Sequence, residues 1–226
     1  MPVRLIFTSN QLKPEHFYDR FCNVILELCH NDMNQIVLVD DNLREYIHER
    51  FPKYSFISST TKCLTNAEDL RKELKNPNFI ETCLDYNLNK NFKLLELFSE
   101  EEKNKSEFLI NAICPPGCPN RKDHYRLNSL LYLNYNKEYR VPQCPILGNT
   151  LDPITTCSKN NLSPQEIYEK YAPMGFKHFK LEGRTLPDIE IACNYVKYLV
   201  KPEYQYLVLS MLNINGTNKD DKFDLK

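Results

Sequence analysis

Short apolar stretches alternate with longer segments of helical periodicity along most of the chain. The first stretch is RLIFTSN at residues 4–10, and the others likewise end in polar residues before a helical pattern begins. We predict strands in seven such stretches, at residues 4–10, 35–41, 54–61, 79–87, 107–114, 153–159 and 178–184. Strands of this length that alternate with helices are typical of βαβ units in a parallel sheet.

The repetition predicts an α/β protein with a (β/α) barrel of the TIM type. A complete barrel has eight strands and about 250 residues, whereas this chain of 226 residues supplies about seven units. We therefore expect an incomplete barrel over residues 1–200 that lacks its first unit, with the strands at 4–10 and 178–184 as its edges. A Cys-containing insertion is expected near 114–150, and residues 201–226 form a C-terminal extension with a frayed end. A doubly wound open sheet is the alternative, because periodicity does not distinguish the two.

Two of the expected helices begin with residues that cap helix N-termini. Asn66 is followed three residues later by Asp69, and Ser163 is followed three residues later by Glu166. Such pairs satisfy N–H groups of the first turn that have no partner within the helix. The pairs therefore predict helix starts at these positions.

Composition narrows the class of protein without naming a function. A hydrophobic content of 42% and a charged content of 26% are typical of a globular protein. The net charge of −1 argues against a surface that binds nucleic acids or anionic membranes in general. It does not exclude a local basic patch. No apolar run reaches the roughly 18 residues of a membrane span, and the N-terminus lacks the features of a signal peptide. Nine cysteines without such a signal favour the reducing cytoplasm.

Polar side chains follow nearly every predicted strand. In a parallel architecture these positions meet at one edge of the sheet, where functional sites of such folds lie. Polarity at any single strand end is also explained by the adjoining loop. From this edge we predict a pocket of candidate catalytic residues: Asp85, Asn87, Lys159, Glu182 and Arg184. The last two flank Gly183, and the arginine could bind an anionic group in a bidentate manner.

Four cysteines lie in or beside predicted loops and strand ends, and they are Cys114, Cys118, Cys144 and Cys157. The first two bracket a Pro-Pro-Gly turn, in which Gly117 permits a left-handed φ. Four thiolates suit either tetrahedral zinc or a [4Fe-4S] cluster. The other five, Cys22, Cys29, Cys63, Cys83 and Cys193, are interpreted as small buried hydrophobic residues.

Two stretches, LINAICPPGCPNRKDHY and CSKNNLSPQEIYEKYAPMGFKHFKLEGRT, resemble the collagenase-like peptidase family U-thirty-two. The family pattern of a helix that leads into the last barrel strand fits Pro164, Ile167, Tyr168, Gly175, Phe179, Lys180, Glu182, Gly183 and Arg184. The segment FIETCLDYNLNKNFKLLELF also resembles the family's strand that presents an Asp and an Asn. The resemblance covers most of residues 35–200.

This resemblance implies a TIM-barrel-like fold. Several family members act in the hydroxylation of tRNA bases or of ubiquinone precursors, and some bind a [4Fe-4S] cluster through four cysteines. Cys114 and Cys118 correspond best to those ligands, and Cys144 and Cys157 correspond with a shift. The chain departs from the family in starting later and in its CxxxC spacing, which is not that of the hydroxylase members.

The resemblance leaves three functions open. The first is an iron-sulfur enzyme or accessory factor that acts on a small-molecule or RNA-derived substrate. The second is a barrel with a structural zinc that serves as a binding module. The third is a metal-dependent peptidase, which the family name implies, although neither GxSxG nor HExxH occurs in the chain. We expect no membrane association, and a partner chain or upstream segment that completes the barrel.

Overall fold

The computed structural model of the chain describes residues 2–112, 114–134, 160–183 and 187–212. Its centre is a sheet of parallel strands in the order of the chain: β1 (Arg4–Phe7), β2 (Gln35–Leu38), β3 (Ser55–Ser58), β4 (Glu81–Cys83), β5 (Ser106–Leu109) and β6 (His178–Lys180). The α/β class and the parallel sheet are therefore confirmed. The described strands form a curled half-barrel of six strands, where we expected about seven.

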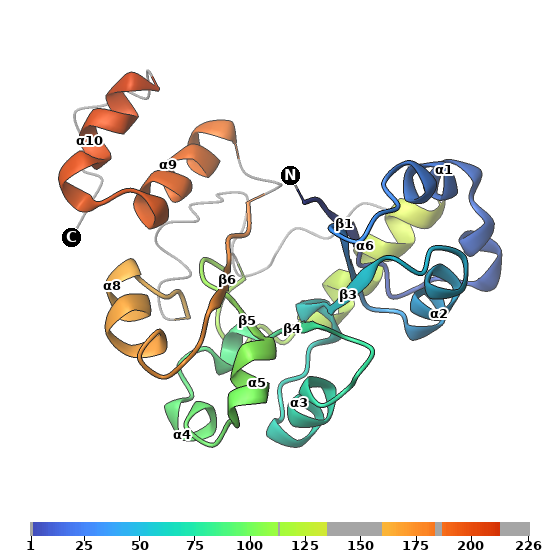
Figure 1. The fold of residues 1–226 in the computed structure, drawn as a ribbon, viewed down its shortest axis with the longest axis horizontal. Coiled ribbons are helices and arrows are strands. Elements are labelled where there is room, and N and C mark those ends of the chain that lie inside the picture. Colours follow the sequence, from blue (N-terminus) through green and yellow to red (C-terminus); the bar gives the residue numbers. More distant parts are fainter. Residues whose placement is uncertain (1, 113, 135–159, 184–186, 213–226) are drawn as a thin grey trace.

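Helices connect and follow the strands. They are η1 (Pro14–Tyr18), α1 (Arg20–Leu28), α2 (Asp41–Arg50), η2 (Thr60–Lys62), α3 (Ala67–Leu74), η3 (Tyr86–Leu88), α4 (Phe92–Leu95), α5 (Glu100–Lys105), α6 (Arg121–Asn134), α8 (Pro164–Glu166), the π-helical η4 (Ile167–Tyr171), α9 (Asp188–Leu199) and α10 (Pro202–Met211). Figure 1 shows α1, α2, α3, α5, α4 and α8 following one another around the outside of the sheet, with α10 farthest from it. None of the helices within the described ranges is long and apolar enough to cross a membrane.

The outer face of the sheet carries the hydrophobic core. One cluster packs α1 and α2 against the first strands and contains Leu26, Ile36, Leu38, Leu43, Ile47, Tyr54, Phe56 and Phe79. A second cluster lies under α3, α4 and η4 and includes Leu70, Leu74, Leu94, Leu95, Phe98, Phe108, Ile110, Tyr171 and Phe176. Strand residues alternate between the two faces of a sheet, so alternate apolar residues such as Ile36 and Phe108 turn toward these helices. Cys83 and Leu109 lie on the other face and belong to a smaller cluster.

The inner face carries a layer of charges that joins the two sides of the half-barrel. Arg4 on β1 forms ion pairs with Glu107 on β5 and with Glu81 on β4, the latter at 2.9 Å. From β6, His178 Nδ1 lies 3.6 Å from Glu81 and Lys180 Nζ lies 3.9 Å from Glu107. Because β1 reaches β5 through a side chain, the sheet must curl toward a barrel.

The two edge strands of the sheet lie in the predicted stretches 4–10 and 178–184. β1 and β6 occupy the ends of the strand order and do not pair with each other. The strand predicted at residues 153–159 lies outside the described residues. β5 pairs directly with β6, with Phe108 opposite Phe179, so no strand lies between them in the sheet.

The predicted helix caps are confirmed. Asn66 accepts a hydrogen bond from the Asp69 N–H at 2.8 Å, and Ser163 and Glu166 form a reciprocal capping box. Two helices lie in segments for which no helix was predicted. α6 lies within the segment 114–150, and α10 lies within the segment 201–226.

Candidate functional site

The turn 114–118 lies beside the segment that follows β4, and two side chains of that segment hold it. The Tyr86 hydroxyl donates a hydrogen bond to the carbonyl oxygen of Pro115 at 3.3 Å. The Gly117 N–H donates to Asn87 Oδ1 at 2.8 Å. Gly117 has a φ of 65°, the left-handed conformation that glycine adopts without steric cost. The structure thus fixes the backbone that carries two partly exposed thiols at the carboxyl edge of the sheet.

Immediately after this turn, α6 begins with a buried guanidinium. Arg121 is 4% exposed and forms an ion pair with Asp85, which is 1% exposed. Arg121 Nη2 also donates to the Thr60 carbonyl oxygen at 3.2 Å and to its hydroxyl at 3.1 Å. Asp85 Oδ1 accepts from the backbone and side-chain amides of Asn87 at 3.0 and 2.8 Å. Both carboxylate oxygens are occupied, so Asp85 positions its neighbours instead of offering a free oxygen to a substrate.

Two tyrosine rings flank this guanidinium. Arg121 Cζ is 4.2 Å from the ring centroid of Tyr86 and 5.3 Å from that of Tyr125, and its Nε donates to the Tyr125 hydroxyl at 3.2 Å. Burial opposes the charged form, but Tyr125 and Asp85 raise the pKa of Arg121 above its ordinary value. Burial raises the pKa of Tyr125 to about 12 and raises that of Tyr86 as well. The arginine is therefore charged and both phenols are neutral at physiological pH.

A second set of contacts brings the end of β6 to the same edge. Asn111, just after β5, donates to the Glu182 carbonyl oxygen at 2.8 Å and accepts from its N–H at 2.6 Å. The Glu182 carboxylate lies close enough to Tyr125 to contribute to the raised pKa of that phenol. Asn160 Nδ2 donates to Asn87 Oδ1 at 3.2 Å. Segments after β4, β5 and β6 therefore meet around the turn 114–118.

The sequence interpretation missed α6 and the residues that it contributes. Arg121, Tyr125 and Ser129 recur every four residues, so they share one face of the helix. Ser129 Oγ accepts from the Asn10 N–H at 3.1 Å, which ties α6 to the segment after β1. The face that α6 buries is largely polar, so hydrophobic periodicity does not reveal it. The four-residue spacing of these three polar residues was the feature of the sequence that could have predicted the helix.

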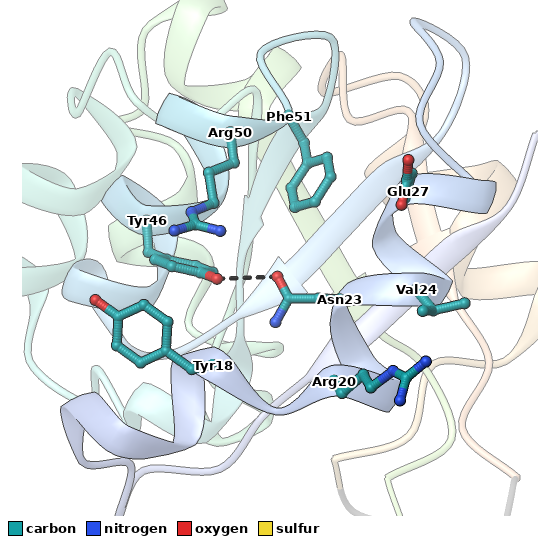
Figure 2. Close-up of a pocket in the computed structure, with 8 residues that line it drawn as sticks. All are labelled: Tyr18, Arg20, Asn23, Val24, Glu27, Tyr46, Arg50 and Phe51. Atoms are coloured by element: carbon teal, nitrogen blue, oxygen red, sulfur yellow. Dashed lines mark hydrogen bonds between the residues drawn. The ribbon is translucent and has the colours of Figure 1, made fainter.

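Two surface cavities lie away from this edge. One, of about 350 Å³, lies between η1, α1 and α2 and is lined by Tyr18, Arg20, Asn23, Val24, Glu27, Tyr46, Arg50 and Phe51. The Tyr46 hydroxyl donates a hydrogen bond to Asn23 Oδ1 at 2.9 Å. Figure 2 shows this bond, with the Arg50 guanidinium beside the tyrosine ring. The other, of about 540 Å³, is lined by Phe92, Glu169, Lys170, Pro173 and Met174. Neither cavity is lined by Asp85, Asn87 or Glu182.

No protein-family model matches this chain. No curated protein and no solved structure matches it either. The resemblance to the U-thirty-two family therefore rests on the sequence motifs alone.

The predicted site residues divide into two groups. Asp85, Asn87, Glu182, Cys114 and Cys118 are described, and they lie at the carboxyl edge of the sheet. Lys159, Arg184, Cys144 and Cys157 lie outside the described residues. Within the described ranges, no group of three or more His, Cys, Asp or Glu is arranged to hold a metal ion. A site of four thiolates therefore stays a prediction.

The cysteines interpreted as structural are of two kinds. Cys63 and Cys83 are buried, as expected, whereas Cys22, Cys29 and Cys193 are partly buried. Burial raises the pKa of Cys83 to about 12 and that of Cys22 to about 11. Thiols with raised pKa values are poor nucleophiles and poor metal ligands.

Proposed function

We propose that this chain is an iron-sulfur protein of the U-thirty-two type, in which Cys114, Cys118, Cys144 and Cys157 bind a [4Fe-4S] cluster. The observation that carries the proposal is the anchoring of the turn 114–118 by two side-chain hydrogen bonds. A backbone held in this way presents its thiols in a defined geometry before any metal arrives. Such preorganisation lowers the conformational cost of binding.

The chemistry of the described residues fits half of the required donor set. Cys114 and Cys118 are partly exposed, so each can reach a metal ion. The permanently charged Arg121 lies next to their turn. Its positive charge would help to offset the negative charge of a thiolate-bound cluster. When bound, the cluster would supply one-electron transfer.

Anaerobic purification of the whole chain tests the proposal. We expect a brown protein with absorbance near about 400 nm and about four irons and four sulfides per chain. Cys114→Ser and Cys118→Ser should each lose most of the bound iron. Cys193→Ser is the matched control, because this partly buried thiol lies on α9, apart from the turn. Equal iron content in all variants would reject the assigned ligands.

The same measurement separates the cluster from zinc. A colourless protein with about one zinc per chain, lost in the variants of the turn 114–118, would support the structural-zinc binding module. A protein that binds neither iron nor zinc would leave the turn without a metal function. Both results would overturn the iron-sulfur proposal.

For the substrate, we propose a tRNA base or a small molecule, which the protein modifies by hydroxylation or a related reaction as an enzyme or accessory factor. In this proposal Arg184, with Lys159, binds an anionic group beside Glu182. Arg184→Ala should weaken binding of tRNA and lower the salt dependence of its affinity by about one unit of slope. Arg126→Ala on the exposed side of α6 is the control, since its side chain is 47% exposed. Fluorescence anisotropy with labelled tRNA measures both.

We also propose that the protein works in the cytoplasm. None of the seven cysteines within the described ranges is joined in a disulfide. Exposed and half-exposed thiols persist in a reducing compartment, whereas oxidising compartments convert them to disulfides. Alkylation of the thiols in intact cells, compared with the purified reduced protein, tests this location.

A further inference from the structure

The helices α9 and α10 carry an exposed apolar surface that the rest of the described chain does not cover. Large apolar side chains on these helices are more than half exposed: Ile189, Tyr195, Leu199, Tyr204, Tyr206, Leu207, Met211 and, at the end of α10, Leu212. Figure 1 shows α10 lying beyond α9, at the margin of the molecule. In contrast, Gln205 is the one residue of α10 whose side chain is buried.

Helix periodicity shows that these side chains form stripes. Tyr204, Leu207 and Met211 follow the spacing i, i+3, i+7, which places them on one face of α10. Tyr195 and Leu199 are four residues apart on α9 and also share a face. A helix that is apolar on the side away from its own domain is normally covered by another element.

The two faces are large enough for an interaction site. At about 100 Å² of exposed area for each of the five side chains on them, they present roughly 500 Å². Tyr206 lies on the opposite side of α10 and adds nothing to this area. Isolated exposed apolar side chains are common, but apolar surfaces of several hundred Å² mark interaction sites. An interface of standard size takes about 800 Å² from each partner, part of it a polar rim around the apolar contact.

The charges beside this surface indicate that a second copy of the same chain covers it. Asp188 lies seven residues before Tyr195, on the same face of α9, and Lys201 lies six residues after it. Both charged residues are exposed, and neither forms an ion pair with another described residue. A two-fold axis at Tyr195 would bring Asp188 of one copy against Lys201 of the other, twice. This self-complementary arrangement is what an isologous dimer requires.

We propose that the α9–α10 surface is a homodimer interface, with α9 packed antiparallel to α9 of the second copy. The stacked tyrosines lie on the two-fold axis, the apolar stripes flank them, and the two Asp188–Lys201 pairs fix the antiparallel orientation. The proposal is independent of the iron-sulfur site, because it concerns the helices after β6 alone.

The first test removes the apolar contact. Sedimentation equilibrium of the whole chain at micromolar concentration should show a dimer. Leu199→Glu should raise the dimer dissociation constant by about 30-fold, as expected for a central contact of an interface. Leu28→Glu on α1 is the matched control, because Leu28 is 80% exposed and Leu199 is 73% exposed. An unmodified chain that is monomeric, or equal effects of both variants, would overturn the proposal.

The second test exchanges charges and distinguishes a second copy from any other occupant. Asp188→Lys and Lys201→Glu should each weaken self-association by about tenfold, through like-charge contacts. A mixture of the two single variants should form a heterodimer, because both pairs are then of opposite sign. The chain with both substitutions should dimerise alone, which also shows that it folds. Failure of both combinations to restore the dimer would reject the antiparallel arrangement.

Discussion

At the scale of single residues, Arg121 organises the carboxyl edge of the sheet. It joins the segments after β3 and β4 through Thr60 and Asp85, and its guanidinium packs against Tyr86. Its carboxylate partner is fully buried at the side chain. Removing one partner of such a pair leaves a charge without compensation in a medium of low polarity.

Arg121→Met is therefore expected to lower the free energy of unfolding by about 3–5 kcal/mol. Urea titration followed by circular dichroism measures this loss. Arg126→Met is the control on the same helix, because its 3.6 Å ion pair with Asp123 is largely exposed. The control substitution should lower the free energy of unfolding by less than about 1 kcal/mol. Similar losses in the two variants would contradict the role given to Arg121.

At the scale of elements, α5 shows how a local capping motif is tied to a tertiary contact. Ser99 Oγ accepts from the Glu102 N–H at 3.2 Å, and Glu102 Oε2 accepts from the Ser99 N–H at 2.8 Å. Arg71 on α3 donates to the same carboxylate at 2.9 Å. The hydrogen bond from Arg71 is the main reason why the pKa of Glu102 lies below its ordinary value of 4.5.

Because the pKa of Glu102 is lower in the folded chain than in the unfolded chain, its charge stabilises the fold at pH values above the unfolded pKa. This stabilisation is lost as the pH falls through the folded pKa. Glu102→Gln keeps an acceptor for the cap but loses the charge. The gap in urea midpoint between the unmodified chain and the variant should be largest at pH 7 and should shrink below pH 4.5. Glu101→Gln, exposed on the same helix, is the control and should show little gap at either pH. A gap that does not change with pH would contradict the assignment.

At the scale of the whole molecule, the half-barrel is held by side chains across its inner face. Backbone hydrogen bonds join each strand to its neighbour, but the contact from β1 to β5 is made by Arg4 and Glu107. Glu107 Oε2 is buried and has no hydrogen-bond partner among the described residues. Arg4 pairs with Oε1 of the same carboxylate, and Lys180 Nζ lies 3.9 Å from Oε2. These two positive charges offset the cost of burying the carboxylate.

Arg4→Met should loosen the edge strand β1 more than it loosens the rest of the sheet. We expect faster amide exchange over Arg4–Phe7 and a loss of about 1–3 kcal/mol in the free energy of unfolding. Hydrogen exchange with mass spectrometry measures the first effect and urea titration the second. Lys53→Met on an exposed loop is the control and should change neither. Uniformly faster exchange through all strands would show that the layer supports the whole sheet instead of this edge.

Much of the architecture was predictable because it depends on local patterns. Alternating apolar and helical segments predicted all six described strands, and the pairs Asn66–Asp69 and Ser163–Glu166 predicted helix starts. The candidate site was predictable only in part. Asp85 and Asn87 were found because polar residues follow strands, whereas Arg121 lay in a segment without apolar periodicity and was interpreted as part of an insertion.

The sequence by itself determined the parallel α/β class and the helix caps, because each depends on residues within a few positions of one another. Only the tertiary structure decided the curl of the sheet, the place of α6 and the partners of the charged groups. Arg4 and Glu107 are separated by 103 positions, and Arg121 and Thr60 by 61. Such contacts depend on how the strands twist and pack together, and no local pattern of hydrophobic and polar residues encodes that geometry.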